Sequence, residues 1–176
     1  MRVIFMGTPD FAVPSLEALL TKHEVVLVVT QPDKPKGRGK KMVPTPVKAC
    51  ALEHGIPVLQ PEKVKEPEFV EQLRSYEPDL IAVTAFGQIL NEPILEMPKY
   101  GCINVHGSLL PKYRGAAPMQ WSIIDGEKVT GITTMYMAKG LDSGDMLLKA
   151  EVEITDEDTF ATIHDKMAVT GANLLL

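Results

Sequence analysis

The chain has 176 residues, 45% of them hydrophobic and 23% charged, which suits one globular domain. Its formal net charge of −5 excludes a generally basic protein that wraps nucleic acid, but it leaves room for a local basic site. The longest aliphatic run, Val25 to Val29, is far shorter than the roughly 20 residues that a membrane span needs. We therefore expect no membrane association. Cys50 and Cys102 form no C-x-x-C pair, so we expect neither a disulfide nor a zinc scaffold, and a cytoplasmic location.

Apolar runs and amphipathic stretches alternate along most of the chain. The runs predict buried strands, and the stretches with apolar residues at helical spacing predict helices. The predicted strands cover residues 2–6, 24–30, 57–59, 79–85 and 102–106, and the predicted helices lie within 12–20, 45–55, 69–76 and 116–125. This alternation predicts an α/β, Rossmann-like fold with a mostly parallel sheet and helices on both faces.

Two helix boundaries are indicated by individual residues. Asp10 is a candidate cap for the first helix. Thr45 followed by Pro46 matches a cap and a first helical position, and Gly55 matches the end of that helix.

The last part of the chain follows a different pattern. Two strand-like runs, 129–138 and 145–154, are separated by a short loop, which predicts an antiparallel addition to the sheet near its C-terminal side. A helix follows, with apolar residues from Phe160 to Leu174 on one face. Because it stops at Leu176 without a polar finish, we expect a truncated helix and a fragment of a longer protein; a frayed terminal helix is the alternative.

Residues 32–41, PDKPKGRGKK, differ in composition from their surroundings. They contain five Lys or Arg and one Asp, a charge of 5 − 1 = +4, which leaves −5 − 4 = −9 for the remainder. Two glycines and two prolines predict no regular structure here, so we expect a mobile surface loop.

The glycines of the chain do not form a nucleotide-binding loop. The first strand ends in Gly7-Thr8-Pro9-Asp10, which has one of the three glycines of G-x-G-x-x-G, so NAD or FAD binding is disfavoured. Gly39-Lys40 is followed by Lys41 and not by Ser or Thr, so it is not a phosphate-binding loop.

Asn104 and His106 are the strongest candidates for chemistry. They are two residues apart on a predicted strand, so they share a face, and they lie near its carboxyl end, where open α/β sheets bind ligands. An amide N–H and an imidazole N–H can together stabilise an oxyanion. Neither is a good nucleophile in this setting, so the pair suggests acyl-type transfer to a nucleophile that the substrate supplies.

Asp142, in the loop between the last two strands, is a candidate partner of His106. A carboxylate there would orient the imidazole and accept a proton from an attacking amine; the alternative is a turn aspartate that binds its own backbone. A metal site built from Cys102, His106 and Asp142 is a competing interpretation. No ligand spacing supports it, and we expect no metal.

The segment NVHGSLLPKYRGAAP, residues 104–118, resembles the signature of the folate-dependent formyltransferases. The resemblance implies that Asn104, His106 and Asp142 are the catalytic residues and that Ser108 to Pro111 form a loop beside the folate. Segments 1–20, 30–61 and 140–148 are similar to the methionyl-tRNA formyltransferase branch of that family, so the resemblance covers nearly the whole chain.

This branch implies a reaction and its substrates. 10-Formyltetrahydrofolate would donate a formyl group to the α-amine of methionyl initiator tRNA, for translation initiation, with Asn104 and protonated His106 stabilising the oxyanion. The expected folate contacts are Phe86, Gly87, Gln88, Ile89, Leu90, Ser108, Leu109, Leu110, Pro111 and Leu141, and the expected tRNA contacts are Lys36, Arg38, Lys40 and Lys41. Residues 1–176 would be a monomeric catalytic domain that lacks the family's C-terminal β-barrel, which helps to bind tRNA.

Three other functions remain open on the sequence. A formyltransferase acting on a sugar-nucleotide amine would share the same active-site residues. A hydrolase that releases formate to water would need the same donor and no amine. An RNA-binding module without catalysis would use only the basic segment, and it would leave Asn104, His106 and Asp142 unexplained.

Overall fold

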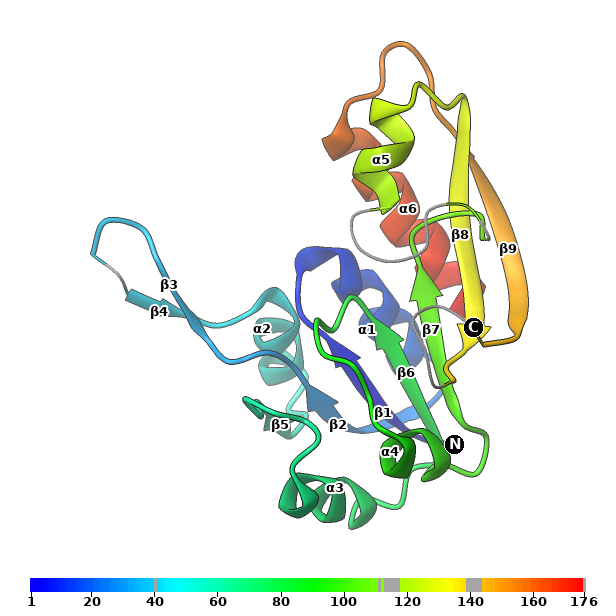
Figure 1. Ribbon diagram of the computed structural model, residues 1–176. Helices are drawn as coiled ribbons and strands as arrows, with labels where there is room; N and C mark the ends of the chain where they lie inside the picture. Colours follow the sequence, from blue (N-terminus) through cyan, green and yellow to red (C-terminus); the bar gives the residue numbers. More distant parts are fainter. Residues whose placement is uncertain (40, 111, 113–117, 139–143, 176) are drawn as a thin grey trace.

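The protein is described by a computed structural model that covers residues 1–39, 41–110, 112, 118–138 and 144–175 (Figure 1). Its centre is a seven-stranded sheet in the order β5-β2-β1-β6-β7-β8-β9. The strands from β5 to β7 are parallel, and β8 and β9 extend the sheet as an antiparallel pair. The predicted fold class and the antiparallel addition are therefore confirmed.

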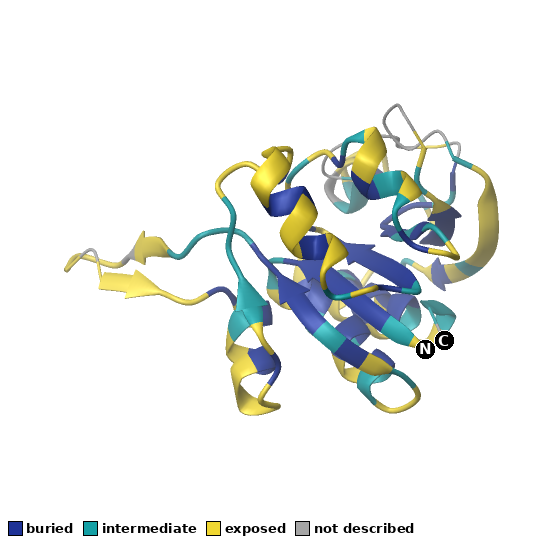
Figure 2. Ribbon diagram, turned by 90° about the horizontal axis from the view of Figure 1, so that it is seen from below, coloured by how far each residue is buried: buried dark blue, intermediate teal, exposed yellow. Residues whose placement is uncertain are grey.

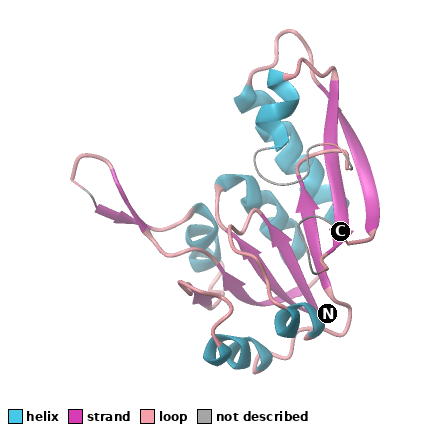
Figure 3. Cartoon of the chain, viewed as in Figure 1, coloured by secondary structure: helices cyan, strands magenta, loops and turns pink. Residues whose placement is uncertain are grey.

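The bounds of most elements follow the predicted segments closely, but the short helix at 92–96 was not predicted from the sequence. The strands of the large sheet are β1 (Arg2–Gly7), β2 (Glu24–Val29), β5 (Val58–Leu59), β6 (Leu80–Thr84), β7 (Cys102–His106), β8 (Val129–Tyr136) and β9 (Met146–Glu153). The helices are η1 (Asp10–Ala12), α1 (Val13–Leu20), α2 (Pro46–Glu53), α3 (Pro67–Arg74), α4 (Glu92–Glu96), α5 (Pro118–Ile124) and α6 (Phe160–Leu175). Figure 3 shows these helices placed around the strands.

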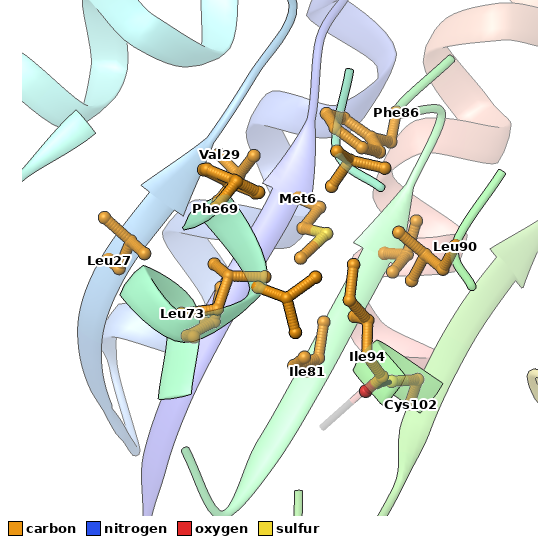
Figure 4. Close-up of a cluster of buried hydrophobic side chains, with 14 residues drawn as sticks. Met6, Leu27, Val29, Phe69, Leu73, Ile81, Phe86, Leu90, Ile94 and Cys102 are labelled. Carbon is orange, nitrogen blue, oxygen red and sulfur yellow. Dashed lines mark hydrogen bonds between the residues drawn. The ribbon is translucent and has the colours of Figure 1, made fainter. Parts of the chain in front are cut away.

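Helices cover both faces of the parallel strands, which explains why those strands are continuously apolar. On one face, Met6 and Ile81 of the sheet pack against Leu73 of α3 and Ile94 of α4 (Figure 4). On the other face, β1 and β2 pack against α1 and α2. The central strands are consequently the most deeply buried part of the molecule (Figure 2).

Helix α6 covers the antiparallel side of the sheet. Ile163 and Met167 are fully buried against Val105 of β7 and Ile132 of β8. This confirms the predicted apolar face of the helix, although Phe160 at its start is 41% exposed.

The prediction that residues 32–41 lack regular structure is wrong. The chain forms a two-stranded antiparallel hairpin of β3 (Lys34–Lys36) and β4 (Lys41–Val43), which extends away from the body of the molecule (Figure 1). Gly37 makes this possible because its φ of 76° reverses the chain in a conformation that other residues rarely adopt. Pro35 is tolerated because a two-stranded ribbon has unpaired outer edges.

Of the two predicted helix caps, one is confirmed. The hydroxyl of Thr45 accepts a hydrogen bond from the backbone N–H of Lys48 at 3.1 Å, and α2 begins at Pro46. Asp10 does not cap α1: it lies within η1, its carboxylate accepts from the N–H of Phe11, and α1 begins at Val13. The 3₁₀ turn places Asp10 one turn ahead of the α-helix, too early to serve as its cap.

Candidate functional site

The parallel strands bring their carboxyl ends to one edge of the sheet, and Asn104, His106 and the segments after β6 and β7 lie at this edge. Gly7 at the end of β1 pairs with Thr84 at the end of β6, and β7 lies on the other side of β6. The segments that follow β6 and β7 therefore start next to each other. This is the edge at which open α/β sheets bind their ligands.

Asn104 and His106 lie on the same face of β7 as Cys102, because alternate residues of a strand share a face. Cys102 belongs to the cluster under α3 and α4, so the two candidates continue that face beyond the core. His106 is only 6% exposed and Asn104 is half-buried. The strand thus presents an amide and an imidazole side by side at the carboxyl edge, as the sequence predicts.

The turn after β7 is held to β8 and β9 by hydrogen bonds from two polar side chains, the buried Thr133 and the exposed Lys149. The hydroxyl of Thr133, which is opposite His106 on β8, donates to the carbonyl of Ser108 at 2.8 Å and accepts from the N–H of Leu110 at 3.1 Å. The ammonium of Lys149 on β9 donates to the carbonyl of Leu110 at 2.6 Å. These bonds fix the backbone beside His106, and Thr133 and Lys149 are contributions that the sequence analysis missed.

The expected folate contacts in this turn have a structural role of their own. The side chains of Ser108 and Leu110 are buried, and the Ser108 hydroxyl donates to the carbonyl of Lys112 at 2.7 Å. Leu109 lies over Gly131 of β8, where a side chain would collide with it. Pro111 lies outside the described residues.

The segment after β6 alternates between anchored and exposed residues. Phe86 and Leu90 are buried in the core, whereas Gly87 is exposed and Ile89 is 68% exposed. Ala85 has a φ of 50°, in the left-handed region, so the backbone turns sharply as it leaves the strand. Residues 87–89 line a hollow of about 510 Å³ together with residues 63–66, which the sequence analysis did not consider.

Leu141 and Asp142 lie outside the described residues, but the ends of their loop are described. The N–H of Met137 donates to the carbonyl of Cys102 at 2.8 Å, so the loop leaves β8 beside the start of β7. His106 is four strand residues further on, about 13 Å away. The contact between Asp142 and His106 therefore stays a prediction from the sequence.

The structure argues against the competing metal site, because Cys102 cannot bind the same ion as His106. Cys102 is at the opposite end of β7 from His106, about 13 Å along the strand, which is too far for both to bind one ion. Burial raises the pKa of the Cys102 thiol to about 12, and its sulfur lies 3.6 Å from the carbonyl of Ile94. Within the described part of the chain, no cluster of three or more His, Cys, Asp or Glu side chains could hold a metal ion.

The β3–β4 hairpin carries exposed positive charge and extends away from the body of the molecule (Figure 1). Lys34, Arg38 and Lys41 are exposed, as is the apolar side chain of Met42, at 62%. Lys40 and the side chain of Lys36 are outside the described set. No described helix has the length and apolar character that crossing a membrane requires.

An ion pair and hydroxyl groups hold the base of the hairpin. The carboxylate of Asp33, before β3, accepts from the ammonium of Lys48 at 2.9 Å, and this bond, with a second from Gln60, lowers the pKa of Asp33. The hydroxyls of Thr30 and Thr45 lie 2.7 Å apart and join the two sides of the base.

Comparison with known proteins gives strong matches over the whole chain. It is 63% identical to the methionyl-tRNA formyltransferase of Ruminiclostridium cellulolyticum over 99% of this chain and 56% of that protein. It is 62% identical to the protein of the same name from Acetivibrio thermocellus, over 99% of this chain and 57% of that protein. The chain thus spans little more than half the length of these curated relatives.

Solved structures share the fold. The phosphoribosylglycinamide formyltransferase of Bacillus halodurans superposes with a TM-score of 0.78 at 25% identity, over 99% of this chain and 95% of that one. A sugar N-formyltransferase from a Shewanella species gives a TM-score of 0.72 at 21% identity, over 99% of this chain and 66% of that one. The family model described as formyl transferase matches residues 1–176, and the chain therefore belongs to the formyl transferase family.

Proposed function

We propose that this chain carries the active site of an enzyme that transfers a formyl group from 10-formyltetrahydrofolate to the α-amine of methionyl initiator tRNA. The observation that carries the proposal is the pairing of Asn104 and His106 on one face of β7, at the carboxyl edge of the sheet. The relatives of about 60% identity named methionyl-tRNA formyltransferase support the choice of acceptor.

The chemistry needs oxyanion stabilisation more than it needs a strong base. An α-amino group titrates near 7.7–8.0 in model peptides, so a useful fraction is neutral near pH 7 and can attack the formyl carbon. The N–H groups of Asn104 and His106 would donate to the oxygen that becomes negative. Asp142 would orient His106 and take the proton that the amine loses, while the bond to the folate nitrogen breaks and that nitrogen is protonated.

The two segments beside this pair would hold the donor. Gly87 and Ile89 are exposed at the carboxyl edge and Leu109 is part-exposed on the neighbouring turn, which supports these three residues as the direct folate contacts. Phe86, Leu90, Ser108 and Leu110 are buried and would act by shaping the backbone. Gln88 is half-buried, and its side chain hydrogen-bonds to Gln31, Pro61 and Val64, outside the segment.

The hairpin would bind the acceptor. Its exposed cations and its projection from the body suit contact with the phosphates of an RNA helix end, with Arg38 at the tip. We further propose that residues 1–176 are a catalytic domain and that the additional length of the relatives contributes to tRNA binding. We also propose that the protein is a cytoplasmic monomer. Its two cysteines are buried free thiols, which supports the reducing compartment.

The proposal is tested by offering competing acceptors. The complete natural polypeptide and residues 1–176 alone would each receive 10-formyltetrahydrofolate with methionyl initiator tRNA, an amino-sugar nucleotide and water, and mass spectrometry would identify the formylated product. Formyl-methionine is the expected product of the complete polypeptide. Formylation of the sugar amine alone, or release of formate alone, would overturn the assigned acceptor.

A further inference from the structure

The base of the hairpin is joined to the segment after β6 by a glutamine pair. Gln31 lies between β2 and the hairpin, and Gln88 lies in the segment after β6. The side-chain amide of Gln88 donates to the side-chain carbonyl of Gln31 at 2.8 Å and to the carbonyl of Pro61 at 3.0 Å. Its own carbonyl accepts from the N–H of Val64 at 2.8 Å. Both donors and the acceptor of Gln88 are therefore engaged, which fixes its orientation.

Two further contacts connect Gln31 with the same segment. The hydroxyl of Thr8 donates to the carbonyl of Phe86 at 2.7 Å and accepts from the N–H of Gln31 at 3.4 Å. Gly87 has a φ of 98°, and a Cβ at that position would lie 2.8 Å from the side-chain nitrogen of Gln31. Three successive residues, 86 to 88, are thus each in contact with Gln31 or joined to it through one hydroxyl.

Gln31 is equally tied to the hairpin base. The side-chain amide of Gln60 donates to the backbone carbonyl of Gln31 at 3.2 Å and to the carboxylate of Asp33 at 2.6 Å. Asp33 in turn accepts from Lys48 of α2. A displacement of the hairpin base must therefore strain the contacts of Gln31, and those contacts reach directly to residues 86–88.

We propose that Gln31 is a positioning residue that couples ligand binding at the hairpin to ligand binding at residues 86–90. An RNA that orders or shifts the hairpin base would change the energy of the Gln31–Gln88 bond and so the affinity of the segment for a folate. By linkage, a folate would change the affinity for RNA by the same factor. The inference rests on the proposed function, because it takes the hairpin as the tRNA contact and the segment as the folate contact.

The test compares one ligand's affinity in the presence and absence of the other. Tetrahydrofolate, which has no formyl group to transfer, would be titrated calorimetrically into the complete polypeptide with and without saturating methionyl initiator tRNA. We expect the two dissociation constants to differ by a factor on the order of five or more. Gln31→Leu, which keeps the size of the side chain but removes its acceptor, should bring this factor close to one.

Two matched variants separate coupling from simple damage. Gln31→Glu retains an oxygen that can accept from Gln88, so the coupling factor should survive. Gln72→Ala removes an exposed glutamine of α3 and should leave the factor unchanged. A wild-type factor of one, or the same factor in Gln31→Leu as in the wild type, would overturn the proposal.

A ligand-free measurement tests the positioning role of Gln31 separately from the proposed function. The backbone amide of Val64, which donates to the side chain of Gln88, should exchange its hydrogen faster in Gln31→Leu than in the wild type, and Gln31→Glu should restore the wild-type rate. Unchanged exchange in Gln31→Leu contradicts the positioning role. Failure of wild-type protein to bind tetrahydrofolate or tRNA would instead reject the proposed function, while the exchange result still tests the contact.

Discussion

The carboxyl edge of the sheet and the β3–β4 hairpin are built in opposite ways. At the edge, Asn104 and His106 lie on a core strand, and the neighbouring turn is held by buried hydrogen bonds from Thr133. In the described part of the hairpin the strands pair only with each other, and Lys34, Arg38 and Lys41 are exposed. One region is fixed by the fold, whereas the other is fixed chiefly at its base.

This difference matches what each region would have to do. Oxyanion stabilisation requires donors held in place before the reaction, because their benefit is lost if they must be reorganised. Attraction of a polyanion depends on charge and reach and tolerates imprecise geometry. Substitutions at the edge should therefore change turnover or stability, and substitutions in the hairpin should change affinity and its dependence on salt.

The largest expected effect is on turnover, at Asn104. Asn104→Ala removes one oxyanion donor, which should lower kcat by about 10²–10³. Asn173→Ala, the same change at an exposed position of α6, is the matched control and should be neutral. Steady-state formyl transfer, with thermal unfolding to confirm the fold, measures both. Near-normal turnover in the Asn104 variant would remove this residue from the mechanism.

The next effect, on stability, comes from the hydrogen bonds that fix the edge. Thr133→Val keeps the shape of the side chain but leaves the buried carbonyl of Ser108 and N–H of Leu110 without this partner. The free energy of unfolding should fall by about 1–3 kcal/mol, and turnover should fall with it. Urea unfolding gives the first quantity, and Thr21→Val, at an exposed hydroxyl, is the control. Equal unfolding midpoints for both variants would show that the turn is not held by Thr133.

The sequence alone predicts the edge better than the hairpin. The strand pattern of residues 102–106 is followed directly by Gly107, and the observed strand β7 has the same bounds as the predicted one. Glycine and proline within 32–41 locally favour a turn, so the pattern predicts irregular structure. Strand pairing of Lys34 with Val43 is a contact across that turn, and no local signal reports it.

The contacts that support both regions were also not predictable. Gln31 and Gln88 are 57 positions apart, and glutamine is equally common on exposed surfaces, so nothing in the sequence pairs them. The burial of Ser108 and Leu110 could not be predicted either, because leucine in a loop suits a ligand pocket and a core equally well. Such roles depend on which distant segments the topology brings together.

A smaller effect should appear in the hairpin. Arg38→Ala removes one exposed cation at the tip, so the slope of log K for tRNA binding against log salt concentration should become shallower by roughly 0.7–0.9, with tetrahydrofolate affinity unchanged. Lys22→Ala makes the same change in net charge after α1 and should keep the wild-type slope. Filter binding across a salt series measures the slope. Equal losses of tRNA and folate affinity would show that the tip has a structural role.

The smallest effect concerns the place where the two regions meet. Hydrogen bonds from Lys48, and then Gln60, lower the pKa of Asp33, so its carboxylate stays charged below the roughly 3.9 of an unperturbed aspartate. A group whose pKa is lower in the folded state stabilises that state above its unfolded pKa, and the benefit is lost as pH falls through the folded pKa. The hairpin base should therefore loosen only in acid, below about pH 4. A carbon-detected NMR titration should place the Asp33 midpoint below the ordinary value, and Lys48→Met should move it upward. If the Asp33 pKa is the same in Lys48→Met as in the wild type, the ion pair does not hold the hairpin base, and the glutamine contacts hold it instead.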